Sequence, residues 1–586
     1  MISLEELNRA TDQQFAAALA GIFEHSPWIA ARTASARPFK SRLELLDAML
    51  AVIDSAALDE QLALIRAHPE LAGKAAVRNE LTVESSREQQ GAGLNACTPE
   101  QFARLHELNS AYSKRFGFPF ILAVRGHDVP SIIASFERRI DNSEEQERAV
   151  ALRQIGFIGG YRLTDLVCVS LGEEIMAMLD ALARISEQED ALTCSYLSVA
   201  HTQTAALLRE WMLAANLSVE IDAVGNVVGR WRSPDRGAKT LITGSHYDTV
   251  INGGRYDGRL GIVLPIVVAA SLKQAGATLP FDLEIVAFAD EEGVRFKSTF
   301  IGSSAVAGTF DPDLLAKRDA NGVSMQEALQ AAGFDPSTIP RIARNPQQLH
   351  GFIEVHIEQG PVLLDRGEAL GVVTAIAGSV RYNVSIVGLA GHAGTVPMGL
   401  RQDAAAAAAE VVLAVERRCS AQPGLVGTVG RLAVPGGAIN VIPGRCELTL
   451  DIRAGDNAIR DAALADVLLA IEQIAARRKV AVKVDKLMSA SAAPCAPAMQ
   501  QAWADSIRRV SPPVSPHVSQ VEPMFLPSGA GHDAMKMAEI TPMGMLFVRC
   551  GNGGISHHPA ETMTTADADL AARAFADFIR NFGKQA

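Results

Sequence analysis

The strongest constraint on the fold is a change in hydrophobic pattern near residue 171. Before it, segments such as RLELLDAMLAVIDSA and PEQFARLHELNSAYSKRF place apolar residues at positions i, i+3, i+4 and i+7, which is the period of amphipathic helices. After it, short strand patterns such as KTLITGSH and LEIVAFAD alternate with helical ones. A chain of 586 residues is also too long for one hydrophobic core. The sequence therefore predicts an all-α N-terminal domain followed by an α/β domain.

A third pattern interrupts the α/β region. RYNVSIVGLAG and RCELTLDIRA alternate apolar and polar residues as half-buried strands do. Between them, DAAAAAAEVVLAVERR is typical of a helix that is capped by Asp403. We therefore expect three domains: a helical domain at 1–168, an α/β domain made of 171–379 and 492–586, and an α+β insertion at 380–491.

Composition excludes several classes of function. The formal net charge of −12 opposes a nucleic-acid partner, which requires a basic face. None of the seven cysteines forms a C-x-x-C pair, so neither a disulfide framework nor a thiolate zinc site is indicated. The N-terminus lacks the apolar core of a signal peptide, and the longest apolar run, GIVLPIVVAASL, is too short to span a bilayer. We expect a cytoplasmic protein with small-molecule substrates and no membrane partner.

Histidines and carboxylates follow several strand patterns of the α/β region. In open α/β sheets, side chains beyond the carboxyl ends of the strands meet at one crevice. Taken alone, each segment is more often a hydrogen-bonded loop or a helix start, but four together favour a metal centre. Imidazole and carboxylate ligands without thiols suit zinc, manganese or cobalt, and this many could hold two ions that share a carboxylate. The segments are GSHYDTVINGGRYDGRLG with His246, Asp248 and Asp257, ADEEGVRF with Asp290, Glu291 and Glu292, FIEVHIEQGP with His356, Glu358 and Gln359, and GISHHPAE with His557 and His558.

Together with GHAGTVPM, these segments resemble in order and spacing the di-metal amidohydrolases of the zinc exopeptidase superfamily. Within it, they resemble the branch of allantoate amidohydrolase and N-carbamoyl-L-amino-acid hydrolase, from about residue 171 to the C-terminus. The resemblance implies two divalent ions per chain, zinc or manganese, and a homodimer formed through the insertion, which acts as a lid. The implied metal ligands are His246, Asp257, Glu292, His356 and His557, with His558 as the alternative to His557.

The same resemblance implies roles for the residues around the ions. Asp257 would bridge the two ions, and Asp248 would orient the ring of His246. Glu291 would be the general base that takes a proton from water. His392, in GHAGTVPM, would reach the substrate across a dimer interface. The implied substrate contacts are Gln359, Asn440 and Arg453, although the residues alone favour Arg453 as a surface arginine on an edge strand.

The helical region has motifs of its own, AHPELAGK, SSREQQGAGL and FGFPFILAVRG. From the residues alone, a His-Pro pair at a helix end and an S-x-x-E cap are usually structural, and any chemistry there would need no cofactor. Together the motifs resemble the all-helical 2-oxo-4-hydroxy-4-carboxy-5-ureidoimidazoline decarboxylase family over about residues 1–168. This resemblance implies His68 as the catalytic acid/base, joined by Glu88. The implied substrate contacts are Ser85, Glu88, Gln89, Phe120, Ile121 and Arg162, with Arg139 as the alternative arginine.

The two resemblances together imply a bifunctional enzyme of purine catabolism. The N-terminal domain would decarboxylate the ureidoimidazoline to (S)-allantoin, and the C-terminal domain would hydrolyse allantoate to ureidoglycine, ammonia and carbon dioxide. One alternative keeps the hydrolytic mechanism but changes the substrate to an N-carbamoyl-L-amino acid or ureidoglycolate. A different class of function would make the helical domain only an assembly module, or the metal site a non-catalytic scaffold. The presence of Glu291 beside a full ligand set opposes the scaffold.

Overall fold

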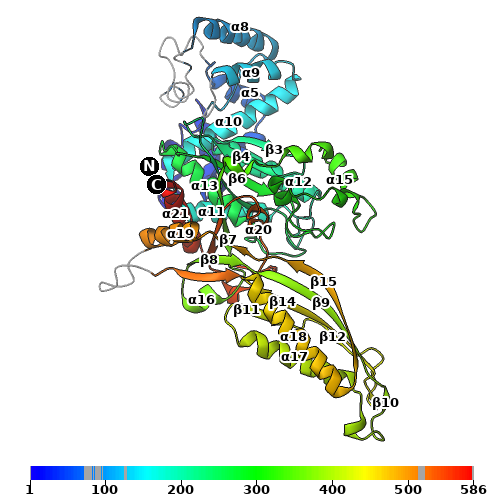
Figure 1. Cartoon of the computed structure of the whole chain (residues 1–586). Helices are drawn as coiled ribbons and strands as arrows, with labels where there is room; N and C mark the ends of the chain where they lie inside the picture. The colour runs from blue at the N-terminus through cyan, green and yellow to red at the C-terminus, as the bar shows by residue number, and fades with distance from the viewer. Residues whose placement is uncertain are drawn as a thin grey trace, which may run out of the picture.

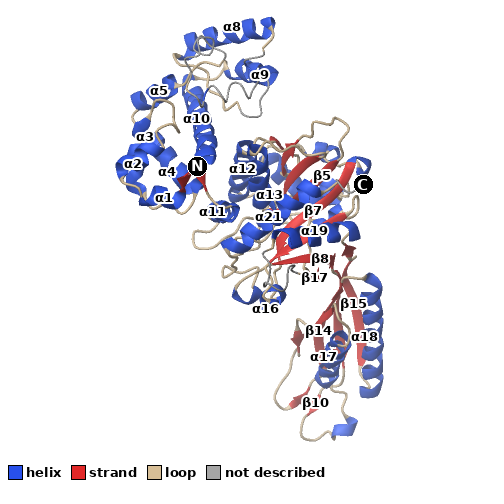
Figure 2. Ribbon diagram, turned by 90° about the vertical axis from the view of Figure 1, so that its left-hand side faces the viewer, coloured by secondary structure: helices blue, strands red, loops and turns tan. Residues whose placement is uncertain are grey.

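The structure, a computed structural model, describes residues 2–71, 82, 85, 94, 97–124, 129–511 and 522–583. Buried apolar side chains form three separate cores, one in each of three successive parts of the molecule. Figures 1 and 2 show these parts in a row, with the helical part at one end, the large sheet in the middle and the smaller sheet at the other end.

The first part is helical and encloses its own core. Its first helix begins with the reciprocal cap between Ser3 and Glu6, as the S-x-x-E spacing predicts. The strands of this part in the described residues, β1 (Ile2–Ser3) and β2 (Val167–Cys168), form a short parallel pair that joins the two ends of the part, which an all-α prediction omits. The helices are α1 (Leu4–Arg9), α2 (Asp12–Ala18), α3 (Pro27–Thr33), α4 (Arg42–Asp54), α5 (Leu58–Ala67), α8 (Pro99–Phe116), α9 (Val129–Arg139) and α10 (Glu144–Leu166).

Glycines in the interior of α10 allow unusually close packing. A Cβ atom at Gly159 would lie 2.7 Å from two ring carbons of Phe23, and one at Gly156 would lie 3.1 Å from a methyl group of Leu50. Each glycine costs a helix about 1 kcal/mol relative to alanine. Here that cost is offset by the approach of α10 to the helices it packs against, which accounts for the glycine pair at 159–160.

The middle part is built on a nine-stranded sheet in the order β16-β8-β18-β7-β5-β6-β4-β3, with β17 beside β8. The four central strands β18, β7, β5 and β6 are parallel to one another, whereas the pairs β3–β4, β4–β6, β8–β18 and β16–β8 are antiparallel. Strand β17 pairs in parallel with β8. An alternation of strands and helices suggests a mostly parallel sheet, but the outer strands of this sheet depart from it, and the short connection between β3 and β4 permits only antiparallel pairing. The strands are β3 (Ser218–Ile221), β4 (Val227–Trp231), β5 (Thr240–His246), β6 (Asp282–Phe288), β7 (Leu349–Ile357), β8 (Leu370–Ile376), β16 (Ala493–Pro494), β17 (Met524–Ser528) and β18 (Met543–Val548).

Helices from both sequence segments of the middle part surround this sheet, and they share one core with it. Strands β6 and β18 are buried over nearly their whole length, as continuous apolar strands of a covered parallel sheet usually are. The helices are α11 (Leu171–Ala183), α12 (Val199–Ala214), α13 (Leu260–Gln274), α14 (Ile301–Ala307), α15 (Met325–Ala331), α16 (Val362–Arg366), α19 (Pro497–Val510), α20 (Ala534–Met537) and α21 (Thr565–Asn581).

The third part is an antiparallel sheet of five strands in the order β11-β14-β9-β15, with β12 beside β14. Two helices pack on it, and Asp403 caps the first of them through the backbone N–H groups of Ala405 and Ala406. A further strand pair, β10 with β13, lies at the end farthest from the large sheet (Figure 1). The elements are β9 (Gly378–Val387), β10 (Gly391–His392), α17 (Ala404–Ser420), β11 (Leu425–Thr428), β12 (Leu432–Ala433), β13 (Val441–Ile442), β14 (Arg445–Ala454), α18 (Asn457–Arg478) and β15 (Ala481–Ala490).

Polar contacts join the helical part to the middle part. Arg42 of α4 forms an ion pair with Glu174 of α11. The side-chain amide of Gln274, at the end of α13, donates hydrogen bonds to the Thr164 carbonyl at 3.1 Å and the Asp165 carboxylate at 2.9 Å. In the described ranges, no helix combines the length and the apolar character that crossing a bilayer requires.

Candidate metal centre and helical-domain cavity

The predicted metal ligands meet at one edge of the large sheet because their strands are neighbours. His246 ends β5 and lies in register with Phe288 at the end of β6, and Glu291 and Glu292 follow directly. His356 lies near the end of β7, which pairs with β5 on its other side. The sheet thus brings three segments to one edge, as the strand-end argument predicts.

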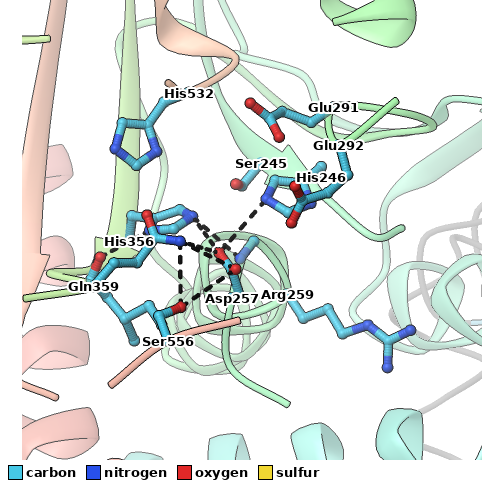
Figure 3. Close-up of polar contacts among 12 residues, drawn as sticks. Ser245, His246, Asp257, Arg259, Glu291, Glu292, His356, Gln359, His532 and Ser556 are labelled. Carbon is cyan, nitrogen blue, oxygen red and sulfur yellow. Dashed lines mark hydrogen bonds and ion pairs between the residues drawn. The ribbon is translucent and has the colours of Figure 1, made fainter. Parts of the chain in front are cut away.

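Asp257 lies at the centre of the cluster (Figure 3). Its Oδ1 atom is 3.8 Å from Nε2 of His246 and 3.3 Å from Nε2 of His356. Its Oδ2 atom is 3.1 Å from Nε2 of His557, which in turn lies 3.4 Å from Oε1 of Glu292. One carboxylate therefore faces two separate groups of ligands, one through each oxygen.

Backbone carbonyls fix the orientation of the two buried imidazoles. Nδ1 of His246 lies 3.1 Å from the carbonyl of Asp248 and 3.4 Å from its Oδ1 atom. Nδ1 of His356 lies 2.8 Å from the carbonyl of Ile357. With Nδ1 engaged in this way, each ring presents Nε2 to Asp257, which is the arrangement that metal-binding histidines usually have.

The Asp248 carboxylate also anchors the segment that follows β6. It accepts the backbone N–H groups of Glu291 at 3.0 Å and Glu292 at 3.1 Å. Burial raises the pKa of Glu291 well above its usual range. Burial, and then repulsion by Asp257, raise the pKa of Glu292 to about 7. Asp248 thus fixes an imidazole and two acidic residues in relation to one another.

This donor set fits divalent metal ions. The ligand atoms of His246, Asp257 and His356 lie within 4.8 Å of one another, and so do those of Asp257, Glu292 and His557. Within the part of the chain that the structure describes, Oε1 of Glu292 is buried and accepts no hydrogen bond, so it is available as a ligand atom for a cation. His246, Glu291 and Glu292 meet the same distance criterion, so geometry alone allows Glu291 to be a ligand as well as a base. His558 is exposed and belongs to none of these described groups.

One of the predicted substrate contacts, Gln359, adjoins the cluster, and another, Arg453, lies where the two sheets meet. The Gln359 amide lies 3.1 Å from both oxygens of Asp257, to which it donates. Arg453 lies on β14, which pairs with strands on both sides, so the expectation of an edge strand from the residues alone is wrong. Its guanidinium donates to Asp451 and, at 2.8 Å, to the carbonyl of Gly529, which belongs to the middle part. Arg453 thus connects the two sheets.

The structure does not bring His392 and Asn440 to the metal cluster of their own chain. They lie side by side, since His392 pairs with the neighbour of Asn440 in the β10–β13 ladder and the Asn440 carbonyl accepts the N–H of Ala393 at 2.9 Å. Both residues are exposed. Figure 1 places β10 at the end of the smaller sheet that points away from β7.

Several buried polar residues of this region were missed in the sequence. Glu354 accepts hydrogen bonds from Ser245 at 2.7 Å and from the N–H of Ala534 at 3.1 Å. The ligand atoms of Glu354, His356 and His532 also lie within 4.8 Å of one another. Glu354 alternates with His356 along the same strand, and His532 lies in GAGHDA, a glycine-rich segment of the kind that follows strands at such sites. Glu561, the last residue of GISHHPAE, is buried as well.

The helical part contains a cavity that five predicted residues share. It lies between the end of α5, the segment after α8 and the middle of α10. The structure does not describe Glu88 and Gln89, so their predicted roles lie outside the described residues. The lining residues are His68, Pro69, Leu71, Ser85, Phe120, Ile121, Leu122, Val124, Ile158 and Arg162.

A buried histidine and a buried ion pair supply the polar groups of this cavity. Burial lowers the pKa of His68 to about 4, so its imidazole is neutral at pH 7. Its Nδ1 lies 3.0 Å from the Leu64 carbonyl, while Nε2 has no hydrogen-bond partner in the described structure. Arg162 donates to Glu24 at 2.8 Å and to Ser85 at 3.2 Å. Glu24 was not predicted, because no motif surrounds it in the sequence.

The alternative arginine, Arg139, lies behind the cavity wall. It donates to the Ile121 carbonyl at 2.8 Å and to Glu147 at 2.5 Å, and its guanidinium lies 4.2 Å from the centre of the Phe120 ring. It is not among the lining residues. The geometry therefore favours Arg162 for a substrate carboxylate and gives Arg139 a supporting position.

Comparisons with known proteins agree with this division of the chain. Residues 8–164 match the OHCU decarboxylase family, and residues 242–581 match peptidase family M20/M25/M40. An N-carbamoyl-L-amino acid amidohydrolase of Geobacillus stearothermophilus is 38% identical over 68% of this chain and 96% of its own length. An allantoate deiminase of Arabidopsis thaliana is 38% identical over 71% of this chain and 83% of its own.

A solved structure of another protein has a similar fold. The crystal structure of an amidase of the hydantoinase/carbamoylase family from Burkholderia multivorans aligns with a TM-score of 0.65 and 30% identity, over 70% of this chain and 97% of its own. Hydrolases of family M20 generally depend on two metal ions, and the described residues include matching candidate ligands. The chain therefore belongs to peptidase family M20/M25/M40 and carries an OHCU decarboxylase domain at its N-terminus.

Proposed function

We propose that this protein is a bifunctional enzyme of purine catabolism, whose metal-dependent domain hydrolyses allantoate and whose helical domain decarboxylates the ureidoimidazoline. The observation that carries the hydrolase proposal is the position of Asp257, whose two oxygens face two separate ligand groups. A carboxylate that is shared in this way would suit a centre of two divalent ions, which would polarise the substrate and activate water. The overall reaction converts allantoate and water to ureidoglycine, ammonia and carbon dioxide.

The residues of the centre divide into ligands and a proton carrier. One ion would be held by His246, His356 and Asp257, and the other by Asp257, Glu292 and His557. When bound, such ions polarise a carbonyl group and lower the pKa of water to about 7. Glu291, which is 9% exposed, takes a proton from the attacking water on its carboxylate and delivers it to the leaving nitrogen.

Two further groups suit the two ends of a ureido acid. Arg453 has the planar guanidinium that pairs best with a carboxylate, and it lies where the smaller sheet meets the Gly529 segment. Gln359, with its amide beside Asp257, is placed to contact a ureido group. We assign the substrate carboxylate to Arg453 and the ureido group to Gln359, with Asn440 as a further contact from a second copy.

The choice of allantoate rests on the fused domain. The two relatives above are equally similar to this chain, although one is named for N-carbamoyl-L-amino acids and the other for allantoate. The decarboxylase family makes (S)-allantoin, and hydrolytic opening of that ring gives allantoate. A chain that carries both domains would thus catalyse two reactions of one pathway, which are separated by the ring opening of (S)-allantoin.

The cavity of the helical domain supports decarboxylation without a cofactor. His68 lines the cavity with a neutral imidazole whose Nε2 atom has no hydrogen-bond partner among the described residues, so this atom would give or take a proton. Arg162 and Ser85 lie on the same cavity wall and would hold the carboxylate that leaves as carbon dioxide.

We also propose that the protein is a homodimer formed through the smaller sheet. The region around His392 exposes large apolar side chains, with Met398 78% and Leu400 73% exposed and Ile439 fully exposed. Large apolar side chains that are exposed near one another usually mark an interface when they form one patch. A second copy would cover it and would bring His392 to the metal centre of its partner.

The first experiment is to measure ammonia release by metal-stripped protein after zinc or manganese is restored. Allantoate, ureidoglycolate and an N-carbamoyl-L-amino acid are compared as substrates. We expect metal-dependent turnover that is highest with allantoate. Turnover of another ureido compound would keep the mechanism and change the substrate, whereas metal binding without any turnover would support the non-catalytic scaffold.

A further inference from the structure

Glu561 is a buried carboxylate next to the metal centre for which the proposed mechanism has no use. It is 2% exposed and lies between the GISHHP segment and helix α21. It belongs to none of the groups of described residues that could hold an ion. Burying an acid costs free energy unless its oxygens are paired, so its contacts show what it does.

One oxygen of Glu561 holds the loop that carries Asp257. Oε1 accepts the backbone N–H of Tyr256 at 2.8 Å and that of Asp257 itself at 3.2 Å. The approach is possible only because residue 254 is glycine, since a Cβ atom there would lie 2.2 Å from the carboxyl group of Glu561. The Gly-Gly pair of the Asp257 loop thus makes room for this carboxylate.

The other oxygen holds the turn that carries His557. Oε2 accepts the hydroxyl of Ser556 at 2.8 Å, and the same hydroxyl lies 3.5 Å from Oδ2 of Asp257. His557 has a φ angle of 54°, a left-handed conformation that costs a non-glycine residue roughly 1 kcal/mol or more. Its side chain is 51% exposed, so packing does little to hold it in place.

The two ion positions therefore differ in how they are held. At the first, His246 and His356 are buried and are fixed by backbone carbonyls next to them in sequence. At the second, His557 is exposed, so the position of its imidazole depends on the turn that carries it. We propose that Glu561 is a positioning residue that sets the affinity of the second ion position, by joining the Asp257 loop to the Ser556–His557 turn.

This inference rests on the proposed two-ion centre, and its test measures metal binding rather than activity. Metal-stripped full-length protein is titrated with zinc or manganese by calorimetry, in the wild type and in Glu561→Ala. We expect two binding events in the wild type. In the variant, the weaker event should lose about 10–100-fold in affinity, which is the usual effect of removing a group that supports a metal ligand. The tighter event should stay within about threefold.

Conservative variants separate positioning from a general loss of stability. Glu561→Gln keeps an oxygen for the two backbone N–H groups and an amide that can donate to Ser556, so it should recover most of the affinity. Ser556→Ala removes the hydroxyl that joins Glu561 to the His557 turn, together with its longer contacts to Asp257 at 3.5 Å and Gln359 at 3.3 Å. It leaves the hydrogen bonds of Glu561 to the Asp257 loop in place, and it serves if Glu561→Ala does not fold. The matched control is Asp567→Asn, another buried acid, in the first turn of α21, whose partners in the described structure are Arg549 and Thr564.

The outcomes distinguish the inference from the proposed function. Wild-type binding of two ions with unchanged binding in Glu561→Ala and Ser556→Ala would overturn the role of Glu561 alone. An equal loss at both positions, or the same selective loss in Asp567→Asn, would also overturn it. Wild-type binding of a single ion would overturn the two-ion centre, and the inference with it.

Discussion

The metal centre and the helical-domain cavity differ in how their buried polar groups are stabilised. The metal centre gathers four buried or nearly buried acids beside three imidazoles, a donor set that fits divalent cations. The acids are Asp248, Asp257, Glu291 and Glu292. The cavity of the helical domain buries one imidazole in its neutral form, and it pairs its arginine with Glu24.

This difference indicates whether each site requires a metal ion. Asp257 faces imidazoles on both sides. Burial, and then repulsion by Asp257, raise the pKa of Glu292 to about 7. In the helical domain, the polar groups are already balanced within the chain. The first site should therefore depend on metal and the second should not, and each prediction below tests that contrast.

Removal of metal should have the largest effect. Chelation followed by desalting is expected to abolish ureido hydrolysis and to leave decarboxylation of the ureidoimidazoline at its original rate, because the helical cavity contains no comparable ligand group among its described residues. Ammonia release and the loss of the ureidoimidazoline chromophore would be followed in the same sample. Parallel loss of both activities would show that the sites are not independent.

Glu291→Gln should lower the rate of hydrolysis by about 10²–10⁴-fold, which is the usual contribution of a general base. Two ions should still bind, because the remaining residues complete both ligand groups. Steady-state kinetics and metal analysis would be compared with Glu472→Gln, an exposed glutamate of α18. Loss of an ion together with activity would instead make Glu291 a ligand, as the His246–Glu291–Glu292 group permits.

His68→Ala should lower the rate of decarboxylation by about 10²–10⁴-fold and leave the rate of hydrolysis unchanged. Because burial holds the pKa of His68 near 4, the neutral form predominates down to about pH 5, so decarboxylation by the wild type should decline only as the pH falls through about 4. Decarboxylation rates measured between pH 4 and 8 test whether activity falls only at the acidic end of this range. The control is His106→Ala, on the exposed face of α8. A decline already centred near pH 6.5 would contradict the buried, neutral imidazole.

Gly159→Ala should have the smallest effect, a loss of about 1–3 kcal/mol in the free energy of unfolding of the helical domain. The added Cβ would overlap the Phe23 ring, and this clash outweighs the gain of about 1 kcal/mol in helix propensity. Denaturant unfolding would be compared with Gly21→Ala, where the structure leaves open space. A more stable Gly159→Ala protein would show that α10 is not closely packed there.

The sequence predicts which candidate ligands come together, because the ends of strands determine where side chains lie. His246 and His356 lie at the ends of neighbouring strands and Glu292 follows a third, and the carboxyl ends of parallel strands meet at one edge of a sheet. In the helical domain, His68, Ser85 and Arg162 come together as the motif resemblance implies, although no periodic pattern would join residues so far apart.

Other features depend on tertiary packing that no local pattern encodes. The outer strands of the large sheet form antiparallel pairs, and the alternation of a strand pattern does not show which strands will be its neighbours. Glu24 and Glu561 look like ordinary surface acids in the sequence. Only the fold shows that the first pairs with Arg162 and the second accepts N–H groups from the Asp257 loop.

The exposed position of His392, at the far end of the smaller sheet, has a consequence for mixtures of chains. In the proposed homodimer, each working site combines the acid of one chain with the imidazole of the other. Two inactive proteins, one with Glu291→Gln and one with His392→Ala, would then restore function when their subunits exchange. Random pairing makes half of the dimers mixed, and each mixed dimer has one intact site, so about a quarter of all sites would recover. Hydrolysis would then require two chains, whereas each chain alone would suffice for decarboxylation.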